Sequence, residues 1–258
     1  MALTINHQTN DISATSGSMT IDGAAVGGGG ADLYAANESS PAAQPSATGA
    51  NAVAIGESSR STGTYRPLAV GYDAYASQSY STAIGPNTSA TESNATALGS
   101  GATASGSYSI AIGDATADAY YAVAIGKDAD TNGIRGKYAF ACGDFSTSGD
   151  AQGGQYILRA DVTDTTVTTL TTNNSTASAT NQIVAAADTA IAFEGLVTAL
   201  QNGAQGWSAF KIQGLLVNDG GTSTYVSGSS VTAITNNSGF TVALSADNTN
   251  KALSIKFT

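Results

Sequence analysis

A short motif, in which Ala is followed by an apolar residue and Gly, recurs through the middle of the chain at nearly constant spacing. Its glycines are separated by 15, 14, 14, 14, 13 and 17 residues and are Gly56, Gly71, Gly85, Gly99, Gly113, Gly126 and Gly143. A fixed period of this length is typical of solenoids, in which each turn contacts only its neighbours. We therefore predict one repeat domain of seven turns over residues 49–148.

Side chains alternate in size around the repeated alanine. The residues just before the glycines are Ile55, Val70, Ile84, Leu98, Ile112, Ile125 and Cys142. The residues just before the repeated alanines form a second column of mostly larger residues: Val53, Leu68, Thr82, Thr96, Ile110, Val123 and Phe140. Successive side chains in a strand point to opposite faces, so the larger residues share one face and the alanines the other. The glycine permits the turn that leaves the strand.

Each repeat has room for a second short strand, as in residues 72–79 and 100–107. Two strands per 14-residue turn predict a parallel β-roll, in which turns stack at about 4.8 Å and seven turns make a rod about 30 Å long. We expect the larger residues to fill the thin interior of the roll. We expect the alanines to meet those of two other copies on a shared axis, as a homotrimer. The predicted trimer interface is Ala54, Ala69, Ala83, Ala97, Ala111, Ala124 and Ala141.

Composition narrows the class of protein. Charged residues make up only 11% of the chain, and Ser, Thr, Asn, Gly and Ala dominate, which favours an all-β fold of short strands and turns. A net charge of -10 argues against a nucleic-acid partner. We expect no signal peptide and no membrane insertion, because the opening residues have neither a cationic nor an apolar segment and no apolar run is long enough to span a membrane. We expect no internal disulfide and no metal site, because Cys142 and His7 are the single cysteine and histidine, and we expect no cofactor. Cys142 is expected to be a small core residue.

The spacing of the AxAIG motif resembles the head repeats of trimeric autotransporter adhesins. The resemblance covers about residues 51–148, with seven copies in register. It implies a left-handed parallel β-roll in an interlocked homotrimer. We expect neither the heptad stalk nor the membrane-anchor barrel of that family.

Residues 149–258 differ in character from the repeats. Asn, Asp, Gly and Ser clusters separate strand-like runs at residues 155–162, 189–200, 207–217, 240–246 and 252–258. We predict a small antiparallel β-sandwich-like C-terminal domain. Its aromatic residues Phe193, Trp207 and Phe210 are expected to be core.

Both ends of the chain resemble structural proteins of marine bacteriophages. The stretch GGQYILRADVTD (153–164) is similar to a domain at the C-terminal end of their tail fibres, and residues 2–23 look like the start of such proteins. The resemblance implies that residues 1–48 are a virion-attachment segment. The segment includes a linker, because GGGG (27–30) and a Pro/Ala/Ser tract follow the opening residues.

Paired carboxylates are the candidates for chemistry. The pairs are Asp114 with Asp118, Asp128 with Asp130, and Asp161 with Asp164. Carboxylates at such spacing beside Gly-rich turns are compatible with calcium binding or with acid and base roles on glycosides. They are equally typical of solvated turn residues, and we favour this interpretation because the pairs do not recur in register. With a single histidine and a single cysteine, no nucleophilic triad is expected, so catalytic residues are predicted to be absent.

A further column, distinct from those around the alanine, lies five residues before each glycine. It consists of Asn51, Arg66, Tyr80, Asn94, Tyr108, Tyr121 and Tyr138. The stripe formed by Tyr80, Tyr108, Tyr121 and Tyr138 is a possible surface contact for glycans, because tyrosine offers both a ring and a hydroxyl. The alternative is a packed tyrosine ladder that seals the boundary between subunits.

These observations predict a non-enzymatic, homotrimeric virion fibre protein, in first place a tail fibre that mediates attachment to the host. Residues 1–48 would bind a virion protein, the roll would be a spacer, and the C-terminal domain would contact host polysaccharide or protein. A capsid-decorating head fibre, an adhesin head and, last, a polysaccharide-degrading tailspike are the alternatives. The protein is expected in the virion, assembled in the host cytoplasm.

Overall fold

Every described element of the chain is a β-strand. The computed structural model describes residues 3–6, 11–14, 19–21, 24–26, 43–203 and 206–258. By its contacts the chain divides into two compact units, residues 1–40 and residues 41–258. The prediction of an all-β fold is confirmed.

The first unit contains two antiparallel hairpins. In one hairpin β1 (Leu3–Asn6) pairs with β2 (Asp11–Ala14), and in the other β3 (Met19–Ile21) pairs with β4 (Ala24–Val26). His7 and the predicted linker, with its glycines at 27–30, lie outside the described residues.

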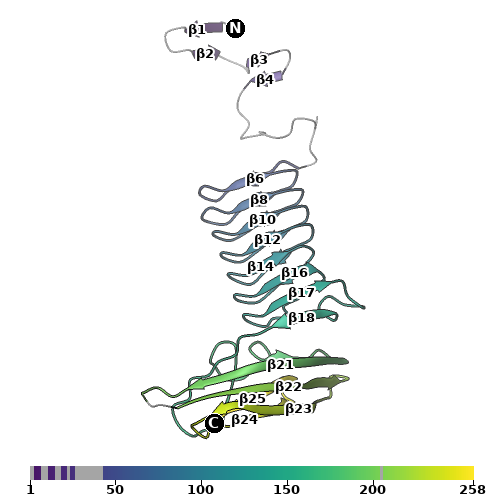
Figure 1. The fold of residues 1–258 in the computed structure, drawn as a ribbon. Helices are drawn as coiled ribbons and strands as arrows, with labels where there is room; N and C mark the ends of the chain where they lie inside the picture. The colour runs from purple at the N-terminus through teal and green to yellow at the C-terminus, as the bar shows by residue number, and fades with distance from the viewer. Residues whose placement is uncertain (1–2, 7–10, 15–18, 22–23, 27–42, 204–205) are drawn as a thin grey trace. The chain divides into compact units, whose positions relative to one another are not determined.

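The repeats form a β-roll of two parallel sheets, with one strand of each turn in each sheet (Figure 1). The parallel strands of the larger sheet are β6 (Val53–Ile55), β8 (Leu68–Val70), β10 (Thr82–Ile84), β12 (Thr96–Leu98), β14 (Ile110–Ile112), β16 (Val123–Lys127) and β17 (Tyr138–Cys142). The strands of the smaller sheet are β5 (Ser46–Ala47), β7 (Arg60–Ser61), β9 (Tyr75–Ala76), β11 (Ser89–Ala90), β13 (Thr103–Ala104) and β15 (Thr116–Ala117). The predicted roll of about seven turns is confirmed.

The predicted register holds for six turns and is wrong for the seventh. From β6 to β16 each alanine pairs with the alanine of the next turn, as Ala97 does with Ala111. In β17, however, Ala139 pairs with Ala124, while Ala141 pairs with Gly126. The loop between β16 and β17 is longer than the other turns, so the motif that ends at Gly143 lies two residues out of register.

The alanines form the interior of the roll, which corrects the predicted trimer interface. Ala69, Ala83, Ala97, Ala111 and Ala124 are 0% exposed in the single chain, where they pack against alanines of the smaller sheet such as Ala76 and Ala104. Side chains without exposed surface cannot contact another subunit. Ala54 and Ala141, at the two ends, are only partly buried. The reason is volume: two strands this close leave room inside for Ala and Ser but not for Leu or Ile.

The glycine column is required by the backbone. Gly113 has a φ of 92°, and a Cβ placed on it would lie 2.7 Å from the carbonyl oxygen of Gly126 in the next turn. Such a conformation and such a close approach both favour glycine.

The roll extends slightly beyond the predicted limits of 49–148. It begins with β5 at Ser46, and β18 (Gln152–Gln155) adds an antiparallel strand to β17 at the other end. The strand β18 thereby covers the last parallel edge of the larger sheet.

The C-terminal region contains two antiparallel sheets, as predicted. One is a meander of three long strands, β21 (Thr189–Leu200), β22 (Trp207–Asp219) and β23 (Ser223–Asn236). In the other, β25 (Ala252–Phe257) pairs with β19 (Thr168–Thr169), β20 (Ile183–Val184) and β24 (Val242–Asp247).

Large apolar residues form the core between these sheets. They include Phe210, Ile212 and Leu216 from β22, and Leu253, Ile255 and Phe257 from β25. The expectation that Phe210 is core is confirmed, and Phe193 packs against the cluster partly buried. Trp207 was predicted to be core and is 48% exposed, because strand alternation directs Ser208 inward and Trp207 outward.

Candidate functional site

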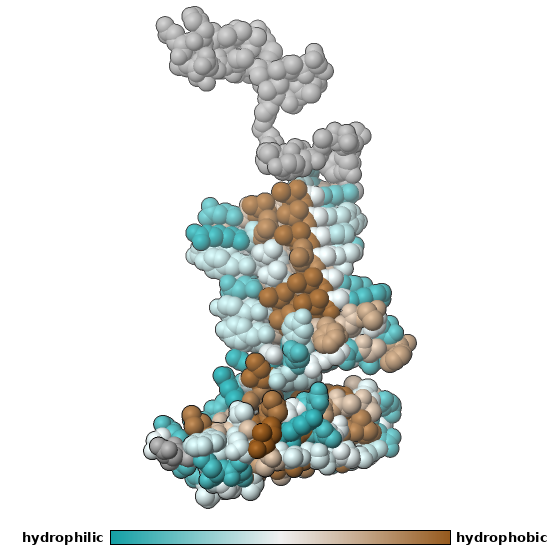
Figure 2. Space-filling model, viewed as in Figure 1, coloured by the Kyte–Doolittle hydropathy of each residue, from teal (hydrophilic) through white to brown (hydrophobic). Residues whose placement is uncertain are grey.

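An apolar stripe on the outer face of the larger sheet is a candidate interaction surface. Two neighbouring columns in register make up this stripe. They are Val53, Leu68, Thr82, Thr96, Ile110, Val123 and Tyr138, and Ile55, Val70, Ile84, Leu98, Ile112, Ile125 and Phe140. Figure 2 shows the stripe as a brown band along the roll.

Every position of the stripe is at least partly exposed, although most of its residues are hydrophobic. Val53, Leu98, Ile110 and Phe140 are 44, 42, 38 and 50% exposed. An exposed apolar surface that is contiguous over several turns is typical of a protein interface. The stripe, and not the alanine face, is therefore the surface of the roll that a second subunit can cover.

The tyrosine column lies at a turn with left-handed backbone conformation. Asn51, Arg66, Tyr80, Asn94, Tyr108 and Tyr121 all have φ between 51° and 61°. Asn adopts this conformation readily, whereas a bulky side chain there costs about 1 kcal/mol or more. Tyr80, Tyr108 and Tyr121 are nevertheless 50, 46 and 52% exposed, so burial of their rings within the chain does not explain the choice of residue.

Three tyrosines form a ring cluster beneath an arginine. The ring centroids of Tyr108 and Tyr121 are 5.0 Å apart, and Tyr120 lies 4.3 Å from Tyr121 and 5.7 Å from Tyr108. The Arg135 guanidinium lies 4.3 Å from the centroid of Tyr120, a cation–π distance. A hydrogen bond with Tyr121 raises the pKa of Tyr120. The Tyr120 ring meets the other two edge to face, and the cluster presents aromatic rings, hydroxyls and a guanidinium together on the roll.

Tyr138 does not belong to this column, contrary to the prediction. It pairs with Val123 in the larger sheet and lies 6.4 Å from Phe140, ring to ring. Gly136, with φ of 68°, takes the left-handed position in that turn. The cause is the same two-residue shift that misplaced Gly143.

Cys142 is exposed, so its prediction as a core residue is wrong. It pairs with Lys127, past the end of the apolar columns, because of the register of β17.

Four of the six paired carboxylates are held by contacts within turns. Asp118 accepts hydrogen bonds from Thr131 Oγ1 at 2.6 Å and from the Gly133 N–H at 2.8 Å. Asp164 accepts one from the Thr166 N–H at 2.7 Å. Asp128 forms an ion pair with Lys127, and Asp130 accepts from the Asn132 N–H at 2.6 Å. Such contacts stabilise turns, and the described residues bring together no group of three metal-binding side chains.

A buried lysine closes the last turn of the roll. Lys137 is 4% exposed, and its Nζ donates to the Asp130 carbonyl at 2.9 Å and to Asn132 Oδ1 at 2.8 Å. Gln152 Nε2 donates to the same two oxygens. Burial lowers the pKa of Lys137 to about 8 and raises that of Asp130. This network replaces the alanine packing at the end of the roll.

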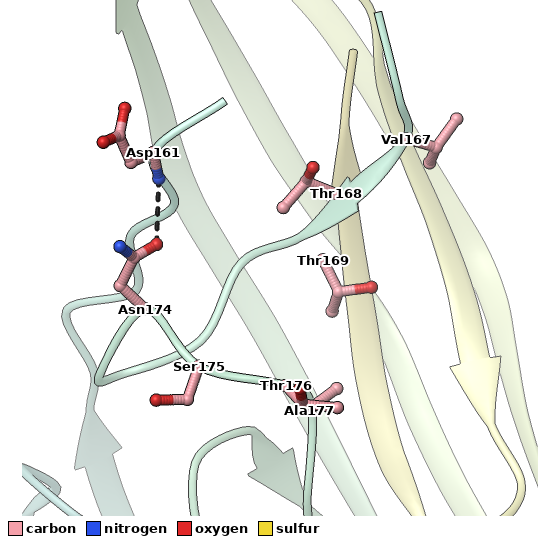
Figure 3. Close-up of a pocket in the computed structure, with 8 residues that line it drawn as sticks. All are labelled: Asp161, Val167, Thr168, Thr169, Asn174, Ser175, Thr176 and Ala177. Carbon is pink, nitrogen blue, oxygen red and sulfur yellow. Dashed lines mark hydrogen bonds between the residues drawn. The ribbon is translucent and has the colours of Figure 1, made fainter. Parts of the chain in front are cut away.

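A polar cavity of about 710 Å³ lies in the C-terminal region (Figure 3). Its lining is mostly hydroxyl, amide and carboxylate: Asp161, Val167, Thr168, Thr169, Asn174, Ser175, Thr176 and Ala177. Asn174 Oδ1 accepts a hydrogen bond from the Asp161 N–H at 2.9 Å, so this amide is partly used within the chain. No aromatic ring lines the cavity.

Comparison with known proteins identifies the roll. Residues 47–65, 68–88 and 90–115 match the YadA head domain repeat. Residues 47–115 of the roll are therefore similar to an adhesin-like head repeat. No curated protein and no solved structure matches the chain. In the part of the chain that the structure describes, no helix has the length and hydropathy to span a membrane.

Sequence reasoning missed three features of these surfaces. The adjacent tyrosines Tyr120 and Tyr121 could have indicated the ring cluster. The sequence around Arg135 gave no indication that the Arg135 guanidinium lies over the Tyr120 ring of the preceding turn. Lys137 gave no signal, because its burial depends on the long loop that contains Asp130 and Asn132 and on Gln152 of β18, which bonds to the same oxygens.

Proposed function

We propose that the chain is the subunit of a homotrimeric virion fibre that attaches to a host cell surface. Residues 1–48 bind the particle, in first place its tail, the roll is a spacer, and the C-terminal region faces the host. The proposal assigns the fibre no catalytic activity. The resemblance of both ends to marine phage proteins supports the virion part, and the match to the YadA head repeat supports the adhesin-like fibre.

The observation that carries the assembly is the apolar stripe. The column from Ile55 to Phe140 is apolar in all seven turns, whereas the column beside it carries Thr82 and Thr96. Three copies related by a three-fold axis would cover one another's stripes and remove them from water. Each buried square ångström of apolar surface contributes about 25 cal/mol, so a stripe of this length favours association. Three identical tips also make weak individual contacts with a surface sufficient through avidity.

Assembly is tested by mass. Light scattering of the full chain is expected to give a trimer, and the double variant Leu98→Ser, Ile110→Ser is expected to give a monomer. Thr103→Ser, on the outer face of the smaller sheet, is the matched control and should remain trimeric. A monomeric wild-type chain, or a trimeric stripe variant, contradicts the proposed axis.

The virion role is tested by location. An antibody against residues 1–48 should label the particle where the fibre is attached, at the tail or, for a head fibre, at the capsid. A bacterial surface adhesin is the second candidate function, and the YadA head match favours it. Label on the bacterial envelope in the absence of phage would support that candidate over the virion.

The exposed tyrosines of the roll contact either surface glycans or the neighbouring subunit. A Tyr108→Ser variant that stays trimeric but adsorbs poorly to cells supports the glycan contact, and one that loses the trimer supports the subunit boundary. Release of oligosaccharides from host lipopolysaccharide or capsule would contradict the non-enzymatic proposal.

A further inference from the structure

A second cavity lies at one end of the three-stranded sheet, where β21 begins, β22 ends and β23 begins. It is an open depression of about 400 Å³, lined by Asp188, Thr189, Ala190, Val217, Asn218, Asp219 and Tyr225. All of these residues belong to one chain and to the C-terminal region. The cavity therefore forms without a second subunit.

The floor of the cavity is an apolar row across the sheet. Ala190 pairs with Val217, and Val217 pairs with Tyr225, so the three side chains lie on one face in one register. Tyr225 is 49% exposed beside the small Ala190 and Val217. A tyrosine ring that is half exposed next to small neighbours is available to pack against a flat ligand.

Hydrogen-bond acceptors border this row. Asp188 is fixed by a hydrogen bond from the Gly220 N–H to its Oδ1 at 2.9 Å, and Asp219 begins the same turn. Neither carboxylate takes part in an ion pair among the described residues. Both remain able to accept hydrogen bonds from a ligand.

A buried amide lies beneath the cavity. Asn218 lies between Val217 and Asp219 in β22, so its side chain points to the opposite, buried face of the sheet. It is 2% exposed, and its Nδ2 donates to the Ala185 carbonyl at 2.9 Å. Asn218 therefore anchors the end of β22 from below and leaves the outer face to Ala190, Val217 and Tyr225.

We infer that this cavity binds a neutral hexose unit of a surface glycan. The inference rests on the proposed attachment function, for which it names the class of ligand. The apolar face of the sugar ring packs on Tyr225, and its hydroxyls donate to the carboxylates of Asp188 and Asp219. Two unpaired carboxylates on a chain of net charge -10 repel acidic sugars, so the site selects neutral ones. The larger polar cavity of Figure 3 lacks the ring that this stacking requires.

Saturation-transfer NMR on the full chain tests the inference. The probes are the methyl hexosides of glucose, galactose and mannose, with glucuronic acid as the acidic comparison. At least one neutral hexoside should receive saturation. Tyr225→Ala and Asp219→Asn should each lower the saturation-transfer amplification factor of that hexoside at least fivefold. Tyr225→Phe, which keeps the ring, should still bind the hexoside.

Tyr72→Ala is the matched control, because Tyr72 is 54% exposed on the roll, away from the cavity residues. The inference is overturned if no neutral hexoside receives saturation, if glucuronic acid alone does, or if Tyr225→Ala binds like Tyr72→Ala. A wild-type chain that is trimeric but binds no neutral hexoside contradicts this site alone. A wild-type chain that binds a neutral hexoside but proves monomeric contradicts the proposed assembly alone.

Discussion

The β-roll and the C-terminal sandwich place their bulky apolar side chains on opposite sides of the backbone. In the roll, Ala97 and Ala111 face inward and Leu98 and Ile110 face outward. In the sandwich, Leu216 faces inward between two sheets that have room for it. The spacing of the sheets decides the outcome, since close sheets admit only small side chains and distant sheets need large ones.

This difference predicts how each region is stabilised. An alanine buries little apolar surface, so the interior of the roll contributes a small hydrophobic term per turn, and much of the apolar surface lies in the stripe. We expect the roll to gain its stability on self-association. The sandwich buries Phe, Ile and Leu within one chain and should be stable without a partner.

The largest expected effect is on the sandwich. Leu216→Ala removes a side chain that is 0% exposed and should lower the free energy of unfolding of the sandwich by about 4 kcal/mol. The fluorescence of Trp207, the single tryptophan, reports the transition in urea. Leu196→Ala, at a position 71% exposed, is the control and should change it by less than about 0.5 kcal/mol. Equal effects of the two variants would contradict the assigned core.

The second effect breaks the roll from the inside. Ala111→Leu adds three carbons between Ala97 and Ala124, which are both fully buried, and should destabilise the roll by about 3 kcal/mol. Far-UV circular dichroism should lose the roll transition while Trp207 fluorescence keeps that of the sandwich. Ile112→Leu, on the outward face of the same strand, is the control. An Ala111→Leu chain that melts like wild type would mean that the alanine faces open space.

The third effect concerns the lysine that closes the roll. The pKa of Lys137 is about 8 when folded and 10.5 when unfolded, so between these values the unfolded chain binds a proton that the folded chain does not. The free energy of unfolding should therefore rise with pH, by about 2 kcal/mol from pH 7.5 to 9.5. Lys137→Met should lack this rise, whereas Lys127→Met, at an exposed lysine, should keep it. The same pH slope in all three chains would contradict a buried lysine.

The sequence was sufficient to predict the period, the two strands per turn and the alternation, because the motif at residues 51–56 repeats with few changes. It did not reveal which face is inside. Alternation shows only that Ala54 and Ile55 point in opposite directions. Which of the two faces is buried depends on the distance between the two sheets, and the sequence pattern does not determine that distance. The seventh turn was misplaced because a longer loop before Tyr138 shifts the strand by two residues.

The sandwich was predicted from its apolar runs and therefore only in part. Residues 189–200 and 207–217 read as strands and form β21 and β22. The third strand, β23, was missed because Ser, Thr and Gly dominate it, and its backbone is held in the sheet by pairing with β22. Tyr225, at one end of this strand, was missed with it, and so was the cavity that it lines.

The smallest expected effect distinguishes the two roles of the tyrosine column. Tyr80 has a φ of 61° and makes no ring contact with another described aromatic residue, so Tyr80→Asn should relieve the backbone and raise the free energy of unfolding by about 1 kcal/mol. Tyr108→Asn is the matched variant and should gain less, because it also loses the rings of Tyr120 and Tyr121. Thermal unfolding of the assembled protein measures both. If Tyr80→Asn lowers the melting temperature instead, the Tyr80 ring packs against a second subunit, and the column is a seal of the trimer instead of a surface for glycans.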